Sequence, residues 1–105
     1  MKPKAEAMKD LLNVRRHRYS IELLGYAGEA SKTILADKEP IRQSEFVAAG
    51  QIEIRPAVMF LVLTREYGGQ KKLIYGGDTY TIYRVYDRPD DGKTELYCEV
   101  RLGGN

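Results

Sequence analysis

The stretch that decides the fold runs from Leu73 to Leu102, LIYGGDTYTIYRVYDRPDDGKTELYCEVRL. Three runs rich in aromatic and β-branched residues are separated by two turn signals, GGD at 76–78 and PDDG at 89–92. Glycine pairs supply the positive φ that hairpin turns need, and a proline fixes one φ of a turn. The spacing predicts a three-stranded antiparallel meander, which the rest of the chain must cover.

The last run of this stretch alternates between apolar and polar residues. One face carries Thr94, Leu96, Cys98, Val100 and Leu102, and the other, expected to face solvent, carries Glu95, Tyr97, Glu99 and Arg101. Alternation with period two predicts a half-buried antiparallel strand. Cys98 is the only cysteine, so no intrachain disulfide can form, and a reducing compartment is favoured. We expect it to be a small buried hydrophobe rather than a nucleophile.

The region before this stretch contains further strand signals. AVMFLVL, at residues 57–63, is the strongest apolar run and predicts a buried strand. Pro40 cannot donate to a ladder and marks the edge or end of a weaker strand. The 105 residues fit a single domain, 1–105. About six short strands predict an all-β, mainly antiparallel, closed or nearly closed small barrel. They are expected at 19–24, 32–41, 56–66, 73–86 (two arms) and 94–102.

Two short segments outside the strands have helical character. Residues 4–14 are mostly good helix formers, so the leader 1–14 is expected to be helical or flexible. A short helical turn is expected near 43–50, with Ser44 as its N-cap and Gly50 as its stop. Residues 51–55 should follow as a linker or a short extended piece.

The net charge of +2 is unevenly distributed along the chain. Residues 1–18 hold six basic and two acidic residues, and the remainder holds 11 basic and 13 acidic residues. The leader is either a solvated basic segment or an arm that touches an acidic neighbour or nucleic acid. Without a long apolar run or a visible signal peptide, the protein is expected to be cytosolic when it folds.

The sequence offers little catalytic chemistry. It has one histidine, His17, and one cysteine, and no Ser/His/Asp set falls into a common strand phase. No Gly-rich phosphate loop is present, and adjacent Asp90 and Asp91 fit a turn better than a metal pair. We therefore expect no enzymatic activity, no cofactor and no metal.

A small oligonucleotide-binding barrel is one alternative. Tyr83, Arg84, Tyr86 and Arg88 lie close together, and aromatic residues interleaved with arginine can stack on bases. Against this, residues 19–105 are net acidic, and phosphate contacts need surplus positive charge.

The order of several segments resembles that of a known family. ADKEPI at 36–41 precedes RQSEFVAAG at 42–50, a strong strand follows, and IYGGDTYTIYRV at 74–85 leads to a turn and a last strand. Over about residues 15–102 the chain resembles the head-closure proteins (head–tail adaptor or joining proteins) of long-tailed bacteriophages and prophages. The resemblance implies a small non-enzymatic barrel that forms a ring below the portal and its adaptor ring. Such a ring retains packaged DNA and presents the surface on which the tail docks.

The resemblance also implies partners and a location. The partners would be the portal/adaptor ring, the tail-completion protein and other copies of the chain. DNA would pass through the channel without sequence-specific binding, and no membrane would be involved. The protein would be a monomer or weak oligomer alone, in the host bacterial cytoplasm during assembly and then in the virion connector. A tail-completion protein of the same particle is the nearest alternative.

Within this family the connection between the second and third strands faces the ring interior or neighbouring subunits. Here that connection is about residues 42–55. The implied candidates for a subunit interface or a channel-facing loop are Arg42, Glu45, Phe46, Gln51, Glu53 and Arg55.

Overall fold

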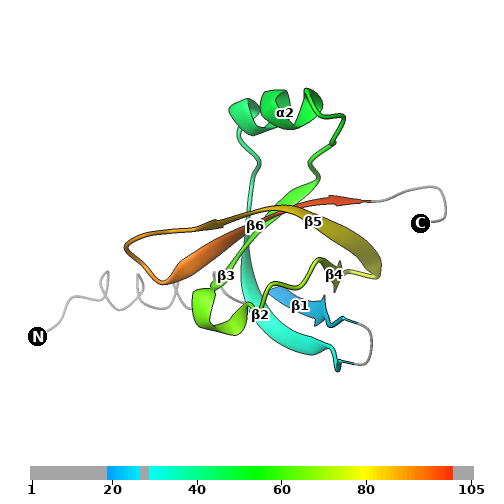
Figure 1. Cartoon of the computed structure of the whole chain (residues 1–105), viewed down its shortest axis with the longest axis vertical. Helices are drawn as coiled ribbons and strands as arrows, with labels where there is room; N and C mark the ends of the chain where they lie inside the picture. Colours follow the sequence, from blue (N-terminus) through cyan, green and yellow to red (C-terminus); the bar gives the residue numbers. More distant parts are fainter. Residues whose placement is uncertain (1–18, 27–28, 101–105) are drawn as a thin grey trace, which may run out of the picture.

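Six strands close into an antiparallel barrel in the computed structural model, which describes residues 19–26 and 29–100 (Figure 1). Their order around the barrel is β1-β2-β3-β6-β5-β4, and β1 pairs with β4 to complete the circle. This architecture confirms the predicted mainly antiparallel, six-stranded barrel. The strands are β1 (Tyr19–Leu24), β2 (Lys32–Glu39), β3 (Val58–Leu63), β4 (Lys72–Tyr75), β5 (Asp78–Asp87) and β6 (Lys93–Val100).

Two strands are shorter than expected, each for a local reason. β2 ends at Glu39, because the following Pro40 has no N–H for a ladder. β3 ends at Leu63, which pairs with the first residue of β6, Lys93. Beyond that point β6 offers no partner, and the chain turns into a 3-10 helix, η1 (Thr64–Glu66). The predicted leader 1–14, His17 and Leu102 lie outside the described residues.

The predicted meander of the last third is confirmed. β4 pairs with β5 and β5 pairs with β6, all antiparallel. Gly76 and Gly77 join β4 to β5 with φ values of 60° and 86°, which residues with a Cβ adopt only at a cost. The glycine pair therefore sets the register in which Tyr75 faces Asp78.

One side of every strand packs into the barrel. Phe60 lies at the centre, with its ring 5.2 Å from that of Tyr75 and 6.3 Å from that of Tyr80. Cys98 is fully buried beside it, as the alternation predicted. The buried interior consists of Ile21, Leu23, Ile34, Ala36, Phe60, Val62, Leu73, Ile82, Leu96 and Cys98.

The outer face of β6 is also covered, so the prediction of a half-buried strand is wrong. Glu95 and Tyr97, expected in solvent, are only 9% and 8% exposed. The cause is a second apolar cluster outside the barrel, which local alternation cannot reveal. It contains Met59, Leu61 and Tyr97, with Ile41 and Tyr83 packed against it.

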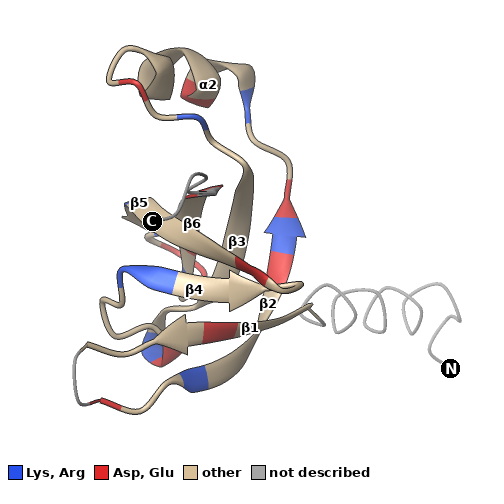
Figure 2. Ribbon diagram, turned by 90° about the vertical axis from the view of Figure 1, so that its right-hand side faces the viewer, with Lys and Arg blue, Asp and Glu red and all other residues tan. Residues whose placement is uncertain are grey.

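The connection between β2 and β3, residues 40–57, is called the arm below. It carries α2 (Gln43–Gly50) and places this helix beyond one end of the barrel (Figures 1 and 2). Gly50 was expected to stop the helix as its C′ residue, but it is the last helical residue and Gln51 is the C-cap; residues 51–53 form a turn in which Glu53 has φ 61°. The predicted cap is wrong: the N-cap is Arg42, and Ser44 lies in the first turn. The reason is that the Arg42 carbonyl already accepts the N–H groups of Glu45 and Phe46.

Candidate functional site

The arm exposes large apolar side chains at the end of the molecule. Phe46, Val47 and Ile52 are 43%, 56% and 66% exposed. The one buried residue of α2 is Ala49. Exposed apolar side chains gathered on a projecting segment indicate a surface that another molecule covers.

The six residues singled out from the sequence lie on this arm but face different ways. Phe46, Gln51, Glu53 and Arg55 are exposed to solvent. Glu45 instead turns back toward the barrel, where its side chain is largely covered. Arg42, exposed at the helix N-cap, lines a cavity between the arm and the barrel. The sequence reasoning missed Val47 and Ile52, although both are adjacent to chosen residues and apolar.

Glu45 fastens the arm to β5. Its carboxylate accepts a hydrogen bond from the Tyr83 hydroxyl at 2.9 Å. The guanidinium of Arg84 lies 3.0 Å from the same carboxylate and also donates through Nε at 3.2 Å. Burial, followed by the hydrogen bond to Glu45, raises the pKa of Tyr83, so the phenol remains a donor at neutral pH. We call this contact the clasp.

A β-bulge brings Tyr83 to the clasp. Ile82 pairs with Cys98 and Arg84 pairs with Tyr97, which leaves Tyr83 as the extra residue between them. An extra residue bends the strand and redirects the side chain that it carries. The bulge therefore presents both Tyr83 and Arg84 to the outer face that the arm approaches.

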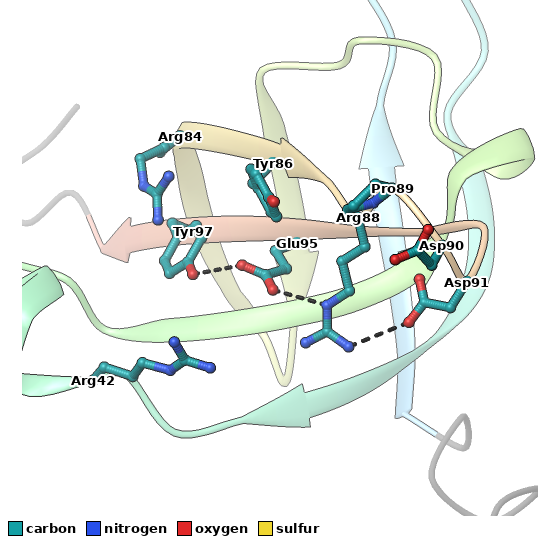
Figure 3. A pocket seen from close by; sticks show the side chains of 9 residues that line it. All are labelled: Arg42, Arg84, Tyr86, Arg88, Pro89, Asp90, Asp91, Glu95 and Tyr97. Carbon is teal, nitrogen blue, oxygen red and sulfur yellow. Dashed lines mark hydrogen bonds and ion pairs between the residues drawn. The ribbon is translucent and has the colours of Figure 1, made fainter.

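A polar network continues from the clasp across the outside of β5 and β6 (Figure 3). The Arg84 guanidinium stacks 4.1 Å from the centre of the Tyr97 ring. The Tyr97 hydroxyl donates to Glu95 at 2.6 Å, and Arg88 donates to the other Glu95 oxygen at 2.8 Å. Arg88 also lies 3.5 Å from Asp91, in the turn before β6, and 3.4 Å from Glu39, at the end of β2.

The pKa shifts follow from these partners. Burial opposes the ionisation of Glu95, but the hydrogen bonds from Tyr97 and Arg88 outweigh it, and the pKa of Glu95 is lowered. Burial, together with the hydrogen bond to Glu95, raises the pKa of Tyr97 to about 12. At neutral pH the pair is thus a neutral phenol donating to a carboxylate.

The network borders a cavity of about 600 Å³, into which Arg42 extends from the arm (Figure 3). Arg84 and Arg88 also line this cavity, but carboxylates already neutralise both. Among residues 19–26 and 29–100, Arg42 makes no hydrogen bond or ion pair through its side chain. The charge of Arg42 nevertheless acts on Glu95, whose pKa it helps to lower, so each of these three arginines lies near a carboxylate.

The sequence hinted at part of this network. It showed Tyr83, Arg84 and Arg88 close together, with carboxylates on the next strand. The pairing of Tyr86 with Glu95 and of Arg84 with Tyr97 depends on the bulge, which no local pattern marks. Glu45 was a better signal for this network, because it is a carboxylate on a short helix and the later strand β5 is rich in hydrogen-bond donors.

Two other kinds of site are absent from the described part of the chain. Within it, no group of three or more His, Cys, Asp or Glu side chains is placed to hold a metal ion. No helix of the described ranges has the length and apolar character needed to cross a membrane. No family model matches this chain, and neither curated proteins nor solved structures gave a match.

Proposed function

We propose that the chain is a structural subunit of a bacteriophage head–tail connector, of the head-closure type. In this function it forms a ring below the portal and its adaptor ring, retains the packaged DNA and presents the docking surface for the tail. The observation that carries the proposal is the arm, which projects from a closed barrel at the position where the resembling family has its interface connection. Its exposed Phe46, Val47 and Ile52 supply apolar area for a subunit contact.

The barrel supports this role as a rigid base. Its interior is filled by side chains, and closure leaves α2 outside the packed core. A ring subunit needs two different patches that meet head to tail, held at a fixed geometry. The clasp, in which Glu45 binds Tyr83 and Arg84, helps to hold the arm in a fixed position on the barrel.

Charge also supports a channel that does not grip DNA. Residues 19–105 hold 11 basic and 13 acidic residues, so this part of the chain has a slight excess of negative charge. Arg84 and Arg88 are paired with carboxylates, which leaves them poorly suited to phosphate contacts. The same pairing disfavours the oligonucleotide-binding alternative, which relies on these two arginines.

The direct test is genetic, in a phage that encodes this chain. Deleting the gene should give filled heads that lose their DNA and tails that remain unattached. Purified wild-type protein added to the defective lysate should restore tail attachment. Filled heads that keep their DNA but lack tails would instead favour the tail-completion alternative, and normal particles would overturn both.

A matched pair of variants connects this test to the arm. Phe46→Asp should abolish restoration, because it places a charge on the proposed contact surface. Val85→Asp, at a side chain of equal 43% exposure on β5, is the control and should restore attachment. A separate binding assay uses short single-stranded oligonucleotides at physiological salt. Micromolar binding that Arg84→Ala removes would replace the proposal with the oligonucleotide-binding alternative.

A further inference from the structure

A second apolar surface lies at the end of the barrel opposite to the arm. It is a groove of about 360 Å³ between the start of β2 and the end of β3. Leu35, on its wall, is 55% exposed. The groove is lined by Thr33, Ile34, Leu35, Leu63 and Glu66.

The groove exists because β2 and β3 separate. Their pairing stops at Asp37 and Leu61, although β2 begins at Lys32 and β3 continues to Leu63. Over Lys32–Ala36, β2 pairs with β1 alone. A strand edge without a neighbour offers backbone groups and apolar side chains to an incoming chain. The gap between the start of β2 and the end of β3 is thus a docking position in an otherwise closed barrel.

The arm of the same chain cannot fill this groove. The arm leaves β2 at its C-terminal end, Glu39, and returns at the N-terminal end of β3, Val58. The groove is formed by the other ends of both strands, so residues 36–39 of β2 lie between the groove and the start of the arm, which is at the far end of the strand (Figure 1). Any contact between them joins two molecules.

The charges at the two surfaces complement each other. The tip of the arm carries exposed Glu53 and Arg55 beside Ile52. The groove carries Glu66, and Lys32, the first residue of β2, donates to the Glu66 backbone carbonyl at 2.9 Å. The arm tip therefore offers Glu53 and Arg55 around an apolar centre, and the groove offers Lys32 and Glu66, with exposed Arg65 next to Glu66. Glu53 can face Lys32 while Arg55 faces Glu66, so that opposite charges meet.

We infer that the groove receives the arm tip of a second copy of this chain, with Ile52 and Phe46 against Leu35 and Leu63. The inference rests on the proposed function, since it names the surface on which the arm acts. The contact is heterologous: one copy contributes its arm and the next contributes its groove. Repetition of such a contact closes into a ring when the rotation between copies allows it.

The test is the oligomeric state of the full chain, measured by sedimentation from micromolar to millimolar concentration. Wild-type protein should associate as its concentration rises. Leu35→Glu in the groove and Ile52→Glu on the arm should each weaken association at least tenfold. Both side chains are exposed, so the barrel should fold in either variant. Val85→Glu, outside both surfaces, should associate as wild type.

Mixing the two defective variants separates the possible geometries. Leu35→Glu retains an arm and Ile52→Glu retains a groove, so an equimolar mixture should form a one-to-one dimer and stop there. An arm-to-arm contact would leave Leu35→Glu fully associated and would overturn the inference. A wild-type chain that stays monomeric throughout the range would also overturn it.

A charge exchange tests the register. Glu53→Lys should weaken association, and the same chain with Lys32→Glu added should recover it; failure of this rescue would overturn the proposed facing of Glu53 and Lys32. These results are independent of DNA retention and tail attachment. If association follows the arm and groove variants but the deleted phage assembles normally, the proposed function fails while the contact stands. If wild type is monomeric but restores tail attachment, only the contact fails.

Discussion

The carboxylate of Glu45, on α2, accepts a hydrogen bond at 2.9 Å from the hydroxyl of Tyr83, which lies on β5, 38 residues further along the chain. The bond joins the projecting arm to the wall of the barrel. Arg84 binds the same carboxylate and stacks on Tyr97, so the clasp continues into the network of β5 and β6. The orientation of the arm thus depends on these polar contacts together with the packing of Ile41 against the cluster of Met59, Leu61 and Tyr97.

Glu45→Gln should loosen the arm without unfolding the barrel. The amide keeps the shape but loses the charge, so the bonds from Tyr83 and Arg84 weaken. Arg84 is half exposed, which limits its share, and we expect a loss of about 1–2 kcal/mol in unfolding free energy. Hydrogen exchange should accelerate in residues 43–54. Glu53→Gln is the control, at an exposed site outside the clasp; equal exchange in both variants would contradict the role of Glu45.

Acid should destabilise the protein through Glu95. Its pKa in the folded state lies below the ordinary value of 4.5, because Tyr97 and Arg88 favour the charged form over the cost of burial. The folded state is therefore stabilised above that ordinary value and loses the contribution as the pH falls through the lowered pKa. Urea titrations of wild type between pH 7 and about pH 2 should show this fall in the unfolding free energy at acid pH.

Glu95→Gln is the matched variant for this pH dependence. It should be less stable than wild type at pH 7, because Arg88 loses its charged partner. The difference between the two proteins should shrink as the pH falls. If the two proteins gave parallel curves of unfolding free energy against pH, Glu95 would not be the cause of the loss of stability in acid.

Local chemistry explains which parts of the fold the sequence could predict. The glycine pair at 76–77 and the turn at 89–92 fix hairpins within a few residues, so the meander followed from them. Pro40 likewise ended β2. Cys98 was placed in the core by simple alternation. Each of these signals acts between neighbours in sequence.

The features that the sequence did not predict depend on distant parts of the chain. Tyr97 is buried because Tyr83 and Ile41, a residue of the arm, pack against its cluster, and Glu95 is held beneath Arg88 and the Tyr97 hydroxyl, which alternation along β6 cannot report. The arm was located correctly, yet Glu45 faces the barrel and Phe46 faces solvent, a difference set by the helix and its clasp. The groove arises where β2 and β3 stop pairing, and no residue pattern marks that point.

Cys98 should be nearly inert toward thiol reagents in the folded protein. It is fully buried, and burial raises the pKa of its thiol to about 12. Reaction then requires unfolding, so at neutral pH it should be at least about a thousandfold slower than in urea-unfolded protein. An aromatic disulfide reagent followed by absorbance measures both rates. Rapid stoichiometric labelling of native protein would contradict the placement of Cys98 in the core.

Excising the arm should separate the barrel from the assembly function. Glu39 and Met59 are paired across β2 and β3, so a short glycine turn can replace residues 42–55 without straining the strands. The barrel should still unfold cooperatively, about 1–3 kcal/mol less stable because Tyr83 and Arg84 lose Glu45. Circular dichroism during a urea titration measures this loss.

The same excised chain should fail to restore tail attachment to a deleted phage, since Phe46, Val47 and Ile52 are gone. The control is an insertion of two glycines after Gly69, in an exposed loop outside the arm, which should leave attachment intact. Attachment by the armless chain would refute the role of the arm. Loss of the barrel itself would show that the arm contributes to folding, because the glycine turn preserves the strand pairing that the barrel needs.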